Sequence, residues 1–397
     1  MAIKGYVEAE KEYIIDLRRY FHQHPELSLQ EYHTAEKIEA ELDGFGVEHQ
    51  RVGATGVLAV VRHFSDAFTA KTVALRADID ALPIQERNDG IPYKSVKEGV
   101  MHACGHDAHA AALLGAVKIL KAQEDSLNGT VLFLFQPAEE VGKGAKEFME
   151  QEMVQKADRV MGIHIASYLK SGQIGINITE SNASCDYFKI TVSGKSAHVS
   201  KPHAGIDALY IASQIVVALQ SIVARGLDPL ESGVVGVGRL EAGTNYNIIA
   251  KDAVLEGTTR AFNHETRRTL NRRVEEIARQ TASMYGGAAE VEFVDFASPL
   301  INDAEVAEEI KKAAEEIVSA ENVKLDVCKS MMADNFAEYL LEKKGQYVFV
   351  GSRKDEATAY PHHHEKFNID EDALLVMTNL YVDYAKSLLY VSPSTIL

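Results

Sequence analysis

The alternation of short apolar runs with helical patterns is the feature that most constrains how this chain can fold. The runs are nearly continuous in apolar residues, which is expected of strands buried on both faces of a sheet. They cover residues 57–61, 72–75, 130–135 and 159–163. Between them, residues 108–120 are rich in Ala and Leu and are typical of a helix. Strands alternating with helices predict an α/β domain with a mixed, largely parallel sheet.

Helices are also predicted at both ends of the chain. Residues 8–21 carry apolar side chains at helical spacing. Ser28 is followed three residues later by Glu31, which fits a capping box opening a second helix towards Leu42. Near the other end, the pattern predicts a helix over 305–318, a buried strand over 346–350 and a terminal helix over 370–389.

The middle of the chain follows a different pattern. Residues 186–192 alternate strictly, with Phe188, Ile190 and Val192 on one face. After them we expect a helix over 206–225, strands over 234–240 and 253–259, a helix over 265–285 and a strand over 289–296. This β-α-β-β-α-β order is typical of a ferredoxin-like unit. We therefore predict an inserted α+β domain at 184–298, within an α/β domain formed by 1–183 and 299–397.

Charge and composition exclude several classes of function. The chain has 41 Lys and Arg against 58 Asp and Glu, a net charge of −17, which argues against a nucleic-acid partner. The most apolar stretch, 208–224, is interrupted by Ser and Gln, so no membrane span is expected, and the N-terminus shows no signal-peptide pattern. Three cysteines are too few for a disulfide framework and favour a reducing compartment. We expect a cytoplasmic enzyme.

Residues that bind metals or move protons follow the predicted strands. Asp78 and Asp80 come after the run at 72–75, Glu139 and Glu140 after 130–135, and His164 after 159–163. The segment that opens the Ala/Leu helix contains His102, Cys104, His106 and His109. Because open α/β sheets bind ligands beyond the carboxyl ends of their strands, we expect these groups at one sheet edge.

Two adjacent carboxylates favour metal-assisted hydrolysis. Gln136-Pro137 ends the strand abruptly, so Glu139 and Glu140 project in divergent directions, and one can bind a metal while the other stays free as a base. Cys104 and His106 offer a thiolate and an imidazole, although so short a pair is weak evidence alone. The simpler alternatives are a buried Cys, a histidine bonded to a backbone carbonyl, and carboxylates in the first turn of a helix.

A cysteine nucleophile is the main rival chemistry. Cys104 at a helix N-terminus would have a lowered pKa, and a neighbouring histidine could act as its base. That interpretation leaves Glu139, Glu140 and His164 without roles, so we prefer the metal. Three consecutive histidines at 362–364 precede Phe367, and only one or two of them could face a common site; a solvated loop is the alternative.

A series of motifs spans nearly the whole chain in a recognisable order. They are His24-Pro-Glu-Leu-Ser28, Arg76-Ala-Asp-Ile-Asp-Ala-Leu-Pro83, Met101-His-Ala-Cys-Gly-His-Asp-Ala-His109, Phe135-Gln-Pro-Ala-Glu-Glu140, Gly162-Ile-His164, Gly194-Lys-Ser-Ala-His198, Pro202-His203, Gly243-Thr244 with Asn247, Gly257-Thr-Thr-Arg260, and His363 with Phe367 and Asp370-Glu371. Together they resemble the N-acyl-amino-acid amidohydrolases. This family of dinuclear metallohydrolases includes hippurate hydrolases, auxin-conjugate hydrolases and acetyl-diaminopimelate deacetylases, and is related to aminoacylases and carboxypeptidases.

The resemblance implies a set of ligands for two divalent metal ions. These ligands are Cys104, which bridges the ions, and His106, Glu140, His164 and His363. His363 is chosen because the family ligand lies four residues before the Phe, and His362 is the alternative. Glu139 matches the general base that activates the metal-bound water. The donors suit Zn²⁺ or Mn²⁺, with Co²⁺ or Ni²⁺ as further alternatives.

The resemblance also implies a ferredoxin-like lid, which in relatives mediates dimerisation, and hence a homodimer or homotetramer. His198, Asn247 and Arg260 match lid residues that bind the scissile carbonyl and the substrate carboxylate, with His198 stabilising the oxyanion or reaching a partner's site. The expected reaction is hydrolysis of the amide bond of small N-acyl amino acids, with an acetyl or aromatic acyl group. A dipeptidase or carboxypeptidase, or a non-catalytic binding relative, is the alternative.

One segment departs from the family pattern. The chain has Ala333-Asp334-Asn335-Phe336 where relatives usually carry Ser-Glu-Asp-Phe. The family does not rely on this segment for metal ligands, so hydrolysis remains the expectation. Its altered charge argues against transferring a relative's substrate preference to this chain.

Overall fold

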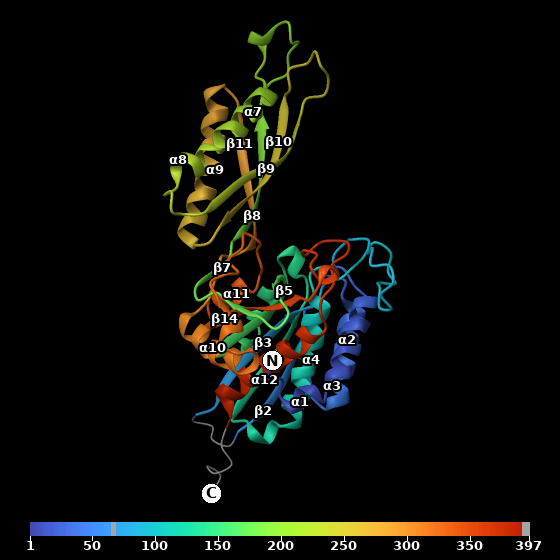
Figure 1. The fold of residues 1–397 in the computed structure, drawn as a ribbon. Coiled ribbons are helices and arrows are strands. Elements are labelled where there is room, and N and C mark those ends of the chain that lie inside the picture. Colours follow the sequence, from blue (N-terminus) through green and yellow to red (C-terminus); the bar gives the residue numbers. More distant parts are fainter. Residues whose placement is uncertain (65–68, 391–397) are drawn as a thin grey trace. The chain divides into compact units, whose positions relative to one another are not determined.

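The computed structural model describes residues 1–64 and 69–390, and the chain divides into two compact units (Figure 1). Unit 1 comprises Met1–Ser181, Asn302–Lys329 and the residues from Asp334 onward. Unit 2 comprises Asn182–Ile301 and Ser330–Ala333. Each unit has a hydrophobic core of its own.

An eight-stranded sheet forms the centre of unit 1, in the order β1-β2-β4-β3-β5-β14-β6-β13. Its strands are β1 (Glu48–Val52), β2 (Gly56–His63), β3 (Lys71–Asp78), β4 (Gly129–Gln136), β5 (Arg159–Lys170), β6 (Ile174–Ile176), β13 (Val323–Leu325) and β14 (Gly345–Arg353). The inner strands β4, β3, β5 and β14 are parallel to one another, whereas β1, β2 and β6 add antiparallel pairs at β1–β2, β2–β4 and β14–β6. The predicted mixed, mostly parallel sheet is confirmed.

Helices cover this sheet, and one of them is almost entirely buried. The helices of unit 1 are α1 (Gly5–Glu8), α2 (Lys11–Gln23), α3 (Tyr32–Phe45), α4 (His106–Ala122), α5 (Ala145–Met149), α6 (Glu152–Gln155), α10 (Ala304–Val318), α11 (Ala337–Leu340) and α12 (Asp372–Leu389). Helix α4 packs against α2, α12 and β3, so side chains all around the helix are buried. Among the helices described, none combines the length and the apolarity needed to cross a bilayer.

Unit 2 contains a four-stranded antiparallel sheet in the order β11-β8-β10-β9. Its elements are β8 (Cys185–Ser193), α7 (Ala208–Leu219), α8 (Ser221–Gly226), β9 (Gly233–Ala242), β10 (Asp252–Ala261), α9 (His264–Met284) and β11 (Ala288–Ala297). Phe188, Ile190 and Val192 are buried and share a core with α7 and α9, as the alternation along this strand predicts. A separate two-stranded sheet pairs β7 (Glu180–Asn182) with β12 (Leu300–Ile301).

Two predicted helices are divided in the structure. The helix expected over 8–21 is interrupted, because α1 ends at Glu8 and α2 begins at Lys11. The helix expected over 206–225 is split into α7 and α8, since the Gln220 N–H bonds to the Val217 carbonyl three residues back and tightens the turn there.

The predicted capping box is wrong. Helix α3 begins at Tyr32, after Glu31, and no side chain in the described part of the chain caps it. Ser28 instead donates to Asp80 (2.7 Å), and Glu31 accepts from Thr55 (2.8 Å). These two side chains point into the protein, where they hold other segments.

The strand expected to end at residue 163 is also longer than predicted. Strand β5 continues to Lys170, because β14 stays paired with it beyond His164. His164 therefore lies within the strand, opposite Phe349 of β14, rather than in a loop after it.

Candidate active site

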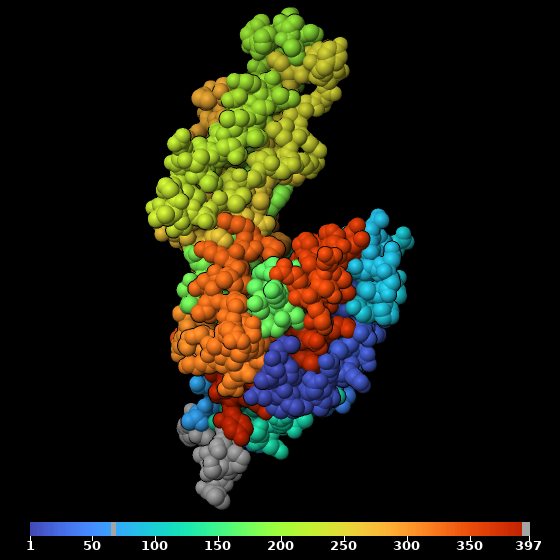
Figure 2. Space-filling view, in the orientation of Figure 1, coloured from blue at the N-terminus to red at the C-terminus, as the bar shows by residue number. Residues whose placement is uncertain are grey.

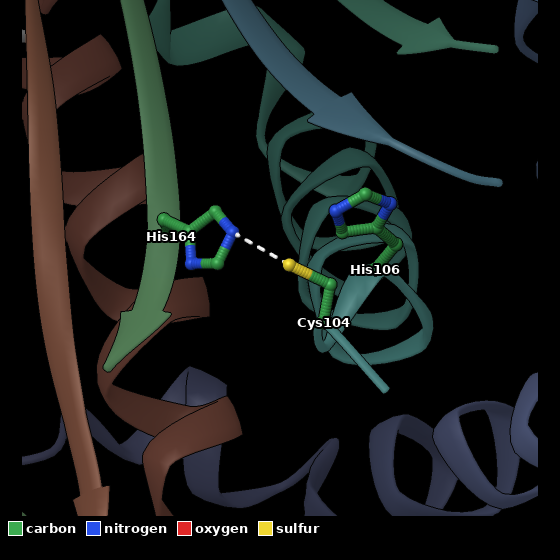
Figure 3. A group of neighbouring side chains, drawn as sticks. All are labelled: Cys104, His106 and His164. Carbon is green, nitrogen blue, oxygen red and sulfur yellow. Dashed lines mark hydrogen bonds between the residues drawn. The ribbon is translucent and has the colours of Figure 1, made fainter. Parts of the chain in front are cut away.

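Cys104, His106 and His164 come together where α4 begins beside β5 (Figure 3). The Cys104 Sγ lies 3.5 Å from the Nε2 of His164. Gly105, between Cys104 and His106 in the chain, has a φ of 91°, and a Cβ there would lie 2.3 Å from the Ile165 side chain. Because only glycine tolerates this backbone conformation and close approach, it lets the chain present both Cys104 and His106 to the same space.

Hydrogen bonds orient both histidines. His106 Nδ1 lies 2.9 Å from the Asp80 carbonyl oxygen, and His164 Nδ1 lies 2.6 Å from the Ile165 carbonyl oxygen. Since a carbonyl only accepts, both Nδ1 atoms carry the proton and both Nε2 atoms are left as lone-pair donors. A backbone or carboxylate partner on the second nitrogen is the usual support of a metal-binding histidine.

The Glu139–Glu140 turn follows β4 and begins with a strained residue. Ala138 has a left-handed conformation with a φ of 56°, which costs about 1–2 kcal/mol for a residue with a side chain. The Glu31 carboxylate accepts the Ala138 N–H (2.8 Å), and Asp80 accepts the Glu140 N–H (3.0 Å). These bonds support the abrupt turn in which Glu139 and Glu140 form one short 3₁₀ helix, η2 (Glu139–Val141).

His363 is brought to the site by the loop that follows β14. Its N–H donates to the Ala103 carbonyl (2.8 Å), and its Nε2 lies 3.3 Å from Glu140 Oε1. The same loop is held by the Arg87 N–H, which donates to the Glu365 carbonyl (2.8 Å); these segments are the adjoining cyan and red surfaces in Figure 2. The His362 ring packs against that of His164, with 5.0 Å between centroids.

The five residues expected to bind metal form two overlapping donor groups. Cys104, His106 and His164 make one, and Cys104, Glu140 and His363 make the other, with the donor atoms of each group within 4.8 Å of one another. Cys104 belongs to both groups. A further group joins His106, Glu140 and Glu139, which places Glu139 beside the potential ligands.

The donor set fits divalent metal ions. His106 Nε2 and Glu140 Oε1 are buried, and neither has a hydrogen-bond partner among the residues described. Such orphaned atoms are costly unless something binds them. Thiolate, imidazole and carboxylate donors together match the preferences of Zn²⁺ and related ions.

The other histidines of the segment 101–109 have different surroundings. His109 uses both ring nitrogens, because Nδ1 contacts Asp78 and Nε2 accepts the Ile165 N–H (2.9 Å). His102 is buried, and burial lowers its pKa to about 4. It belongs to none of the donor groups found in the described part of the chain.

Burial and neighbouring charges shift the pKa values of the site. Burial and the carboxylates of Asp334 and Glu140 raise the pKa of Glu139 well above its usual range. Burial opposes the charge of His106, yet Asp78, Asp80 and Cys104 together outweigh it and raise that pKa. A carboxylate with a raised pKa is a stronger base, as general base catalysis requires.

A buried network that the sequence did not indicate lies behind Glu139. The guanidinium of Arg76 bonds to Asp78 (2.6 Å), Gln136 (3.0 Å) and Asn335 (3.0 Å). Its Nη2 also lies 3.3 Å from Asp334. All of these side chains are buried. One feature of the sequence could have indicated this network. Arg76 and Asp78 occupy alternate positions of a buried strand, and charged residues are rarely buried unless they pair.

The three predicted substrate-binding residues belong to unit 2. His198 is exposed after β8, and its Nδ1 accepts from the Ser200 hydroxyl (2.7 Å). The Asn247 carbonyl accepts the Val199 N–H (3.1 Å), so His198 and Asn247 are neighbours within the unit. Arg260 lies on β10 and is partly buried.

Overlapping groups of potential metal ligands beside a buried carboxyl are the arrangement that a metal-dependent hydrolase needs. The family model described as "Peptidase family M20/M25/M40" matches residues 74–387 of this chain. The chain is 38% identical over 377 residues to N-acetyl-L-cysteine deacetylase of Bacillus subtilis (95% of this chain, 88% of that protein). It is 37% identical over 376 residues to thermostable carboxypeptidase 2 of Saccharolobus solfataricus (94% of each).

A solved structure agrees with these similarities. The Bacillus subtilis YXEP protein, described as a dinuclear metal binding peptidase from the M20 family, superimposes with a TM-score of 0.83 at 33% identity (96% of this chain, 99% of that one). The chain therefore belongs to the M20 peptidase family, and it is a hydrolase that acts on amide bonds.

Proposed function

We propose that this protein hydrolyses the amide bond of small N-acyl amino acids, with two divalent metal ions in its active site. The observation that carries the proposal is the pair of donor groups that share Cys104, with Glu139 buried beside them. The similarity to an N-acetyl-L-cysteine deacetylase supports an acylated amino acid as substrate.

The proposed ligands are Cys104, His106, Glu140, His164 and His363. The ions, Zn²⁺ or Mn²⁺, would supply Lewis-acid activation of water and of the scissile carbonyl. His363 is preferred to His362 because its Nε2 lies beside Glu140 in one donor group, whereas His362 packs against the ring of His164.

Glu139 is the proposed general base. It takes a proton from the attacking water and delivers it to the leaving amine nitrogen, which becomes the amino group of the released amino acid. The raised pKa of Glu139, caused by burial and nearby carboxylates, suits it to hold that proton between the two steps. Its carboxylate is positioned by the Asn335 N–H at 3.3 Å.

We propose that unit 2 is a ferredoxin-like lid that also forms a dimer contact in a cytoplasmic homodimer or homotetramer. The antiparallel order β11-β8-β10-β9 with α7 and α9 supports the ferredoxin-like part of this proposal, and the resemblance to the family suggests the dimer contact. His198 would stabilise the oxyanion and Asn247 the scissile carbonyl. Arg260 would bind the substrate carboxylate, because a guanidinium pairs with a carboxylate through two parallel hydrogen bonds.

The test combines metal content with turnover. Purified protein is stripped with a chelator and reloaded with Zn²⁺ or Mn²⁺, and release of free amino acid is measured from a panel of N-acetyl and N-benzoyl amino acids. We expect about two ions per chain and activity that returns with metal. No uptake and no turnover would refute the proposal and favour a non-catalytic binding protein.

Two variants separate the proposed roles of the adjacent carboxylates. Glu139→Gln should keep the metal content and lose about 10²–10⁴-fold in kcat, as expected of a lost general base. Glu140→Gln should lose metal as well as activity. Wild-type turnover by Glu139→Gln would rule out its assignment as base.

A carboxypeptidase is the second candidate, favoured by the similarity to thermostable carboxypeptidase 2. The two activities differ in the acyl side of the bond, which is a peptide in one and a simple acyl group in the other. Comparing kcat/KM for N-acetyl-amino acids and for dipeptides with the same C-terminal residue distinguishes them.

A further inference from the structure

We infer that Asn335 is a positioning residue that keeps the Glu139–Glu140 turn in its working conformation. The activity part of this inference rests on the proposed function, whereas the structural part does not. Asn335 is fully buried and follows directly on Asp334, in the segment where the chain departs from the family's usual residues.

Asn335 connects the turn to the buried network around Arg76. Its side-chain oxygen accepts from Arg76 Nη2 (3.0 Å) and Gln136 Nε2 (2.9 Å). Its side-chain nitrogen donates to the carbonyl of Lys143. Arg76 and Gln136 are themselves joined by a 3.0 Å bond, so Asn335 is attached to a rigid base.

The hydrogen bonds at this position in the structure match an amide. A guanidinium only donates and a backbone carbonyl only accepts, so the orientation of the Asn335 amide is unambiguous. An aspartate of nearly the same shape would accept from Arg76 but could not donate to Lys143. It would also add a carboxylate to a buried region that already contains Asp334 and Glu139.

The same residue reaches the general base through its backbone. The Asn335 N–H lies 3.3 Å from Glu139 Oε1, while its side chain holds Lys143. The Lys143 N–H in turn donates to the Ala138 carbonyl (2.9 Å), which closes the turn around Glu139. Asn335 therefore contacts both the carboxylate and the far end of the loop that carries it.

Without this support the far end of the turn is held by the Lys143 N–H bond to the Ala138 carbonyl (2.9 Å) and by a long bond of 3.5 Å from Gln136 Nε2 to the Lys143 carbonyl. Gly142 and Gly144, on either side of Lys143, both have positive φ values, and glycine gains more conformational freedom than other residues when a constraint is removed. At the near end, Glu31 already holds the Ala138 N–H. Loss of the Asn335 amide should thus loosen residues 139–144 selectively.

The test compares Asn335→Asp and Asn335→Ala with Asn379→Asp. Asn379 is an equally buried amide, which accepts from the Lys4 N–H and donates to Asp383, and it lies on α12 outside the site. Hydrogen exchange of peptides covering residues 137–144 is followed by mass spectrometry, together with the metal content, kcat and KM on the N-acyl amino acid that wild type hydrolyses fastest.

We expect both Asn335 variants to exchange at least tenfold faster over 137–144, with exchange elsewhere in unit 1 unchanged. Because Glu139 acts in the chemical step, kcat should fall by about 10²-fold while KM stays within twofold and the metal content is retained. Asn379→Asp should lower the thermal midpoint but change neither local exchange over 137–144 nor kcat.

Unchanged exchange over 137–144 in both Asn335 variants would overturn the inference, whether or not the protein is an enzyme. A wild type that hydrolyses nothing would instead overturn the proposed function, and the exchange data would still decide the role of Asn335. Faster exchange with full kcat would show that Asn335 holds the loop without positioning Glu139.

Discussion

Replacing Glu31 tests whether paired hydrogen-bond acceptors hold the strained start of the catalytic turn. Glu31 is fully buried, and its two carboxylate oxygens accept from the Ala138 N–H (2.8 Å) and the Thr55 hydroxyl (2.8 Å). Glu31→Ala leaves two buried donors without acceptors, each costing about 1–3 kcal/mol. We therefore expect the free energy of unfolding to fall by about 2–6 kcal/mol.

Glu31→Gln is the matched variant, and its expected effect is smaller. The amide oxygen can still accept the Ala138 N–H while the amide nitrogen donates to the Thr55 oxygen, so only the Thr55 hydroxyl hydrogen loses its acceptor. The free energy of unfolding should therefore fall by about 1–3 kcal/mol at neutral pH, half of the loss expected for Glu31→Ala. In addition, Glu31→Ala should lower kcat, because Ala138 directly precedes Glu139.

The assay is urea unfolding of the metal-free protein at several pH values. Burial raises the pKa of Glu31, so the folded state binds a proton more readily than the unfolded chain. Wild type should therefore gain stability relative to Glu31→Gln as the pH falls through that raised pKa. If Glu31→Gln loses as much stability as Glu31→Ala, the negative charge rather than the acceptor pair holds the turn, and the reasoning is refuted.

Further predictions concern the buried ion pairs and the substrate. Arg18→Met, which leaves Asp107 buried without the guanidinium 2.9 Å away, should lower stability in urea by about 3–5 kcal/mol; a loss under 1 kcal/mol would contradict it. Burial and Arg18 oppose protonation of His22, yet Asp107 and Glu86 outweigh them and raise its pKa. The stability this histidine contributes should be complete below about pH 6.5 and disappear as the pH rises through the raised value, and His22→Gln should abolish that slope. Arg260→Ala should raise KM about tenfold for substrates with a free carboxylate, and an equal increase for amidated substrates would argue against its role.

Much of the architecture was accessible from local patterns. The continuous apolar runs marked β2, β3, β4 and β5, and the strict alternation at 186–192 marked a strand buried on one face, because side-chain period follows directly from backbone geometry. The motifs likewise identified the metal-binding side chains that the structure brings together. This was possible because metal ions are bound by few residue types, such as the Cys104 and His106 that flank Gly105 and the Glu140 that follows β4.

Local patterns failed where side chains act at a distance. Ser28 and Glu31 have the spacing of a capping box, yet they bind Asp80, Thr55 and Ala138 instead. Burial among these partners satisfies more buried donors than capping an exposed helix end would. The spacing of Ser28 and Glu31 is compatible with a capping box, but in the folded protein both side chains form tertiary hydrogen bonds instead.

By itself the sequence determined the helix and strand periods, the mixed sheet and the set of metal-binding residue types. Only the tertiary structure decided which groups surround Glu139, because Arg76 and Asn335 are 259 positions apart in the chain and no local pattern couples them. The spacing of apolar residues along the sequence depends only on the local backbone conformation, helix or strand. The position and basicity of a catalytic carboxylate depend instead on burial and on charges from distant segments, which exist only once the chain has folded.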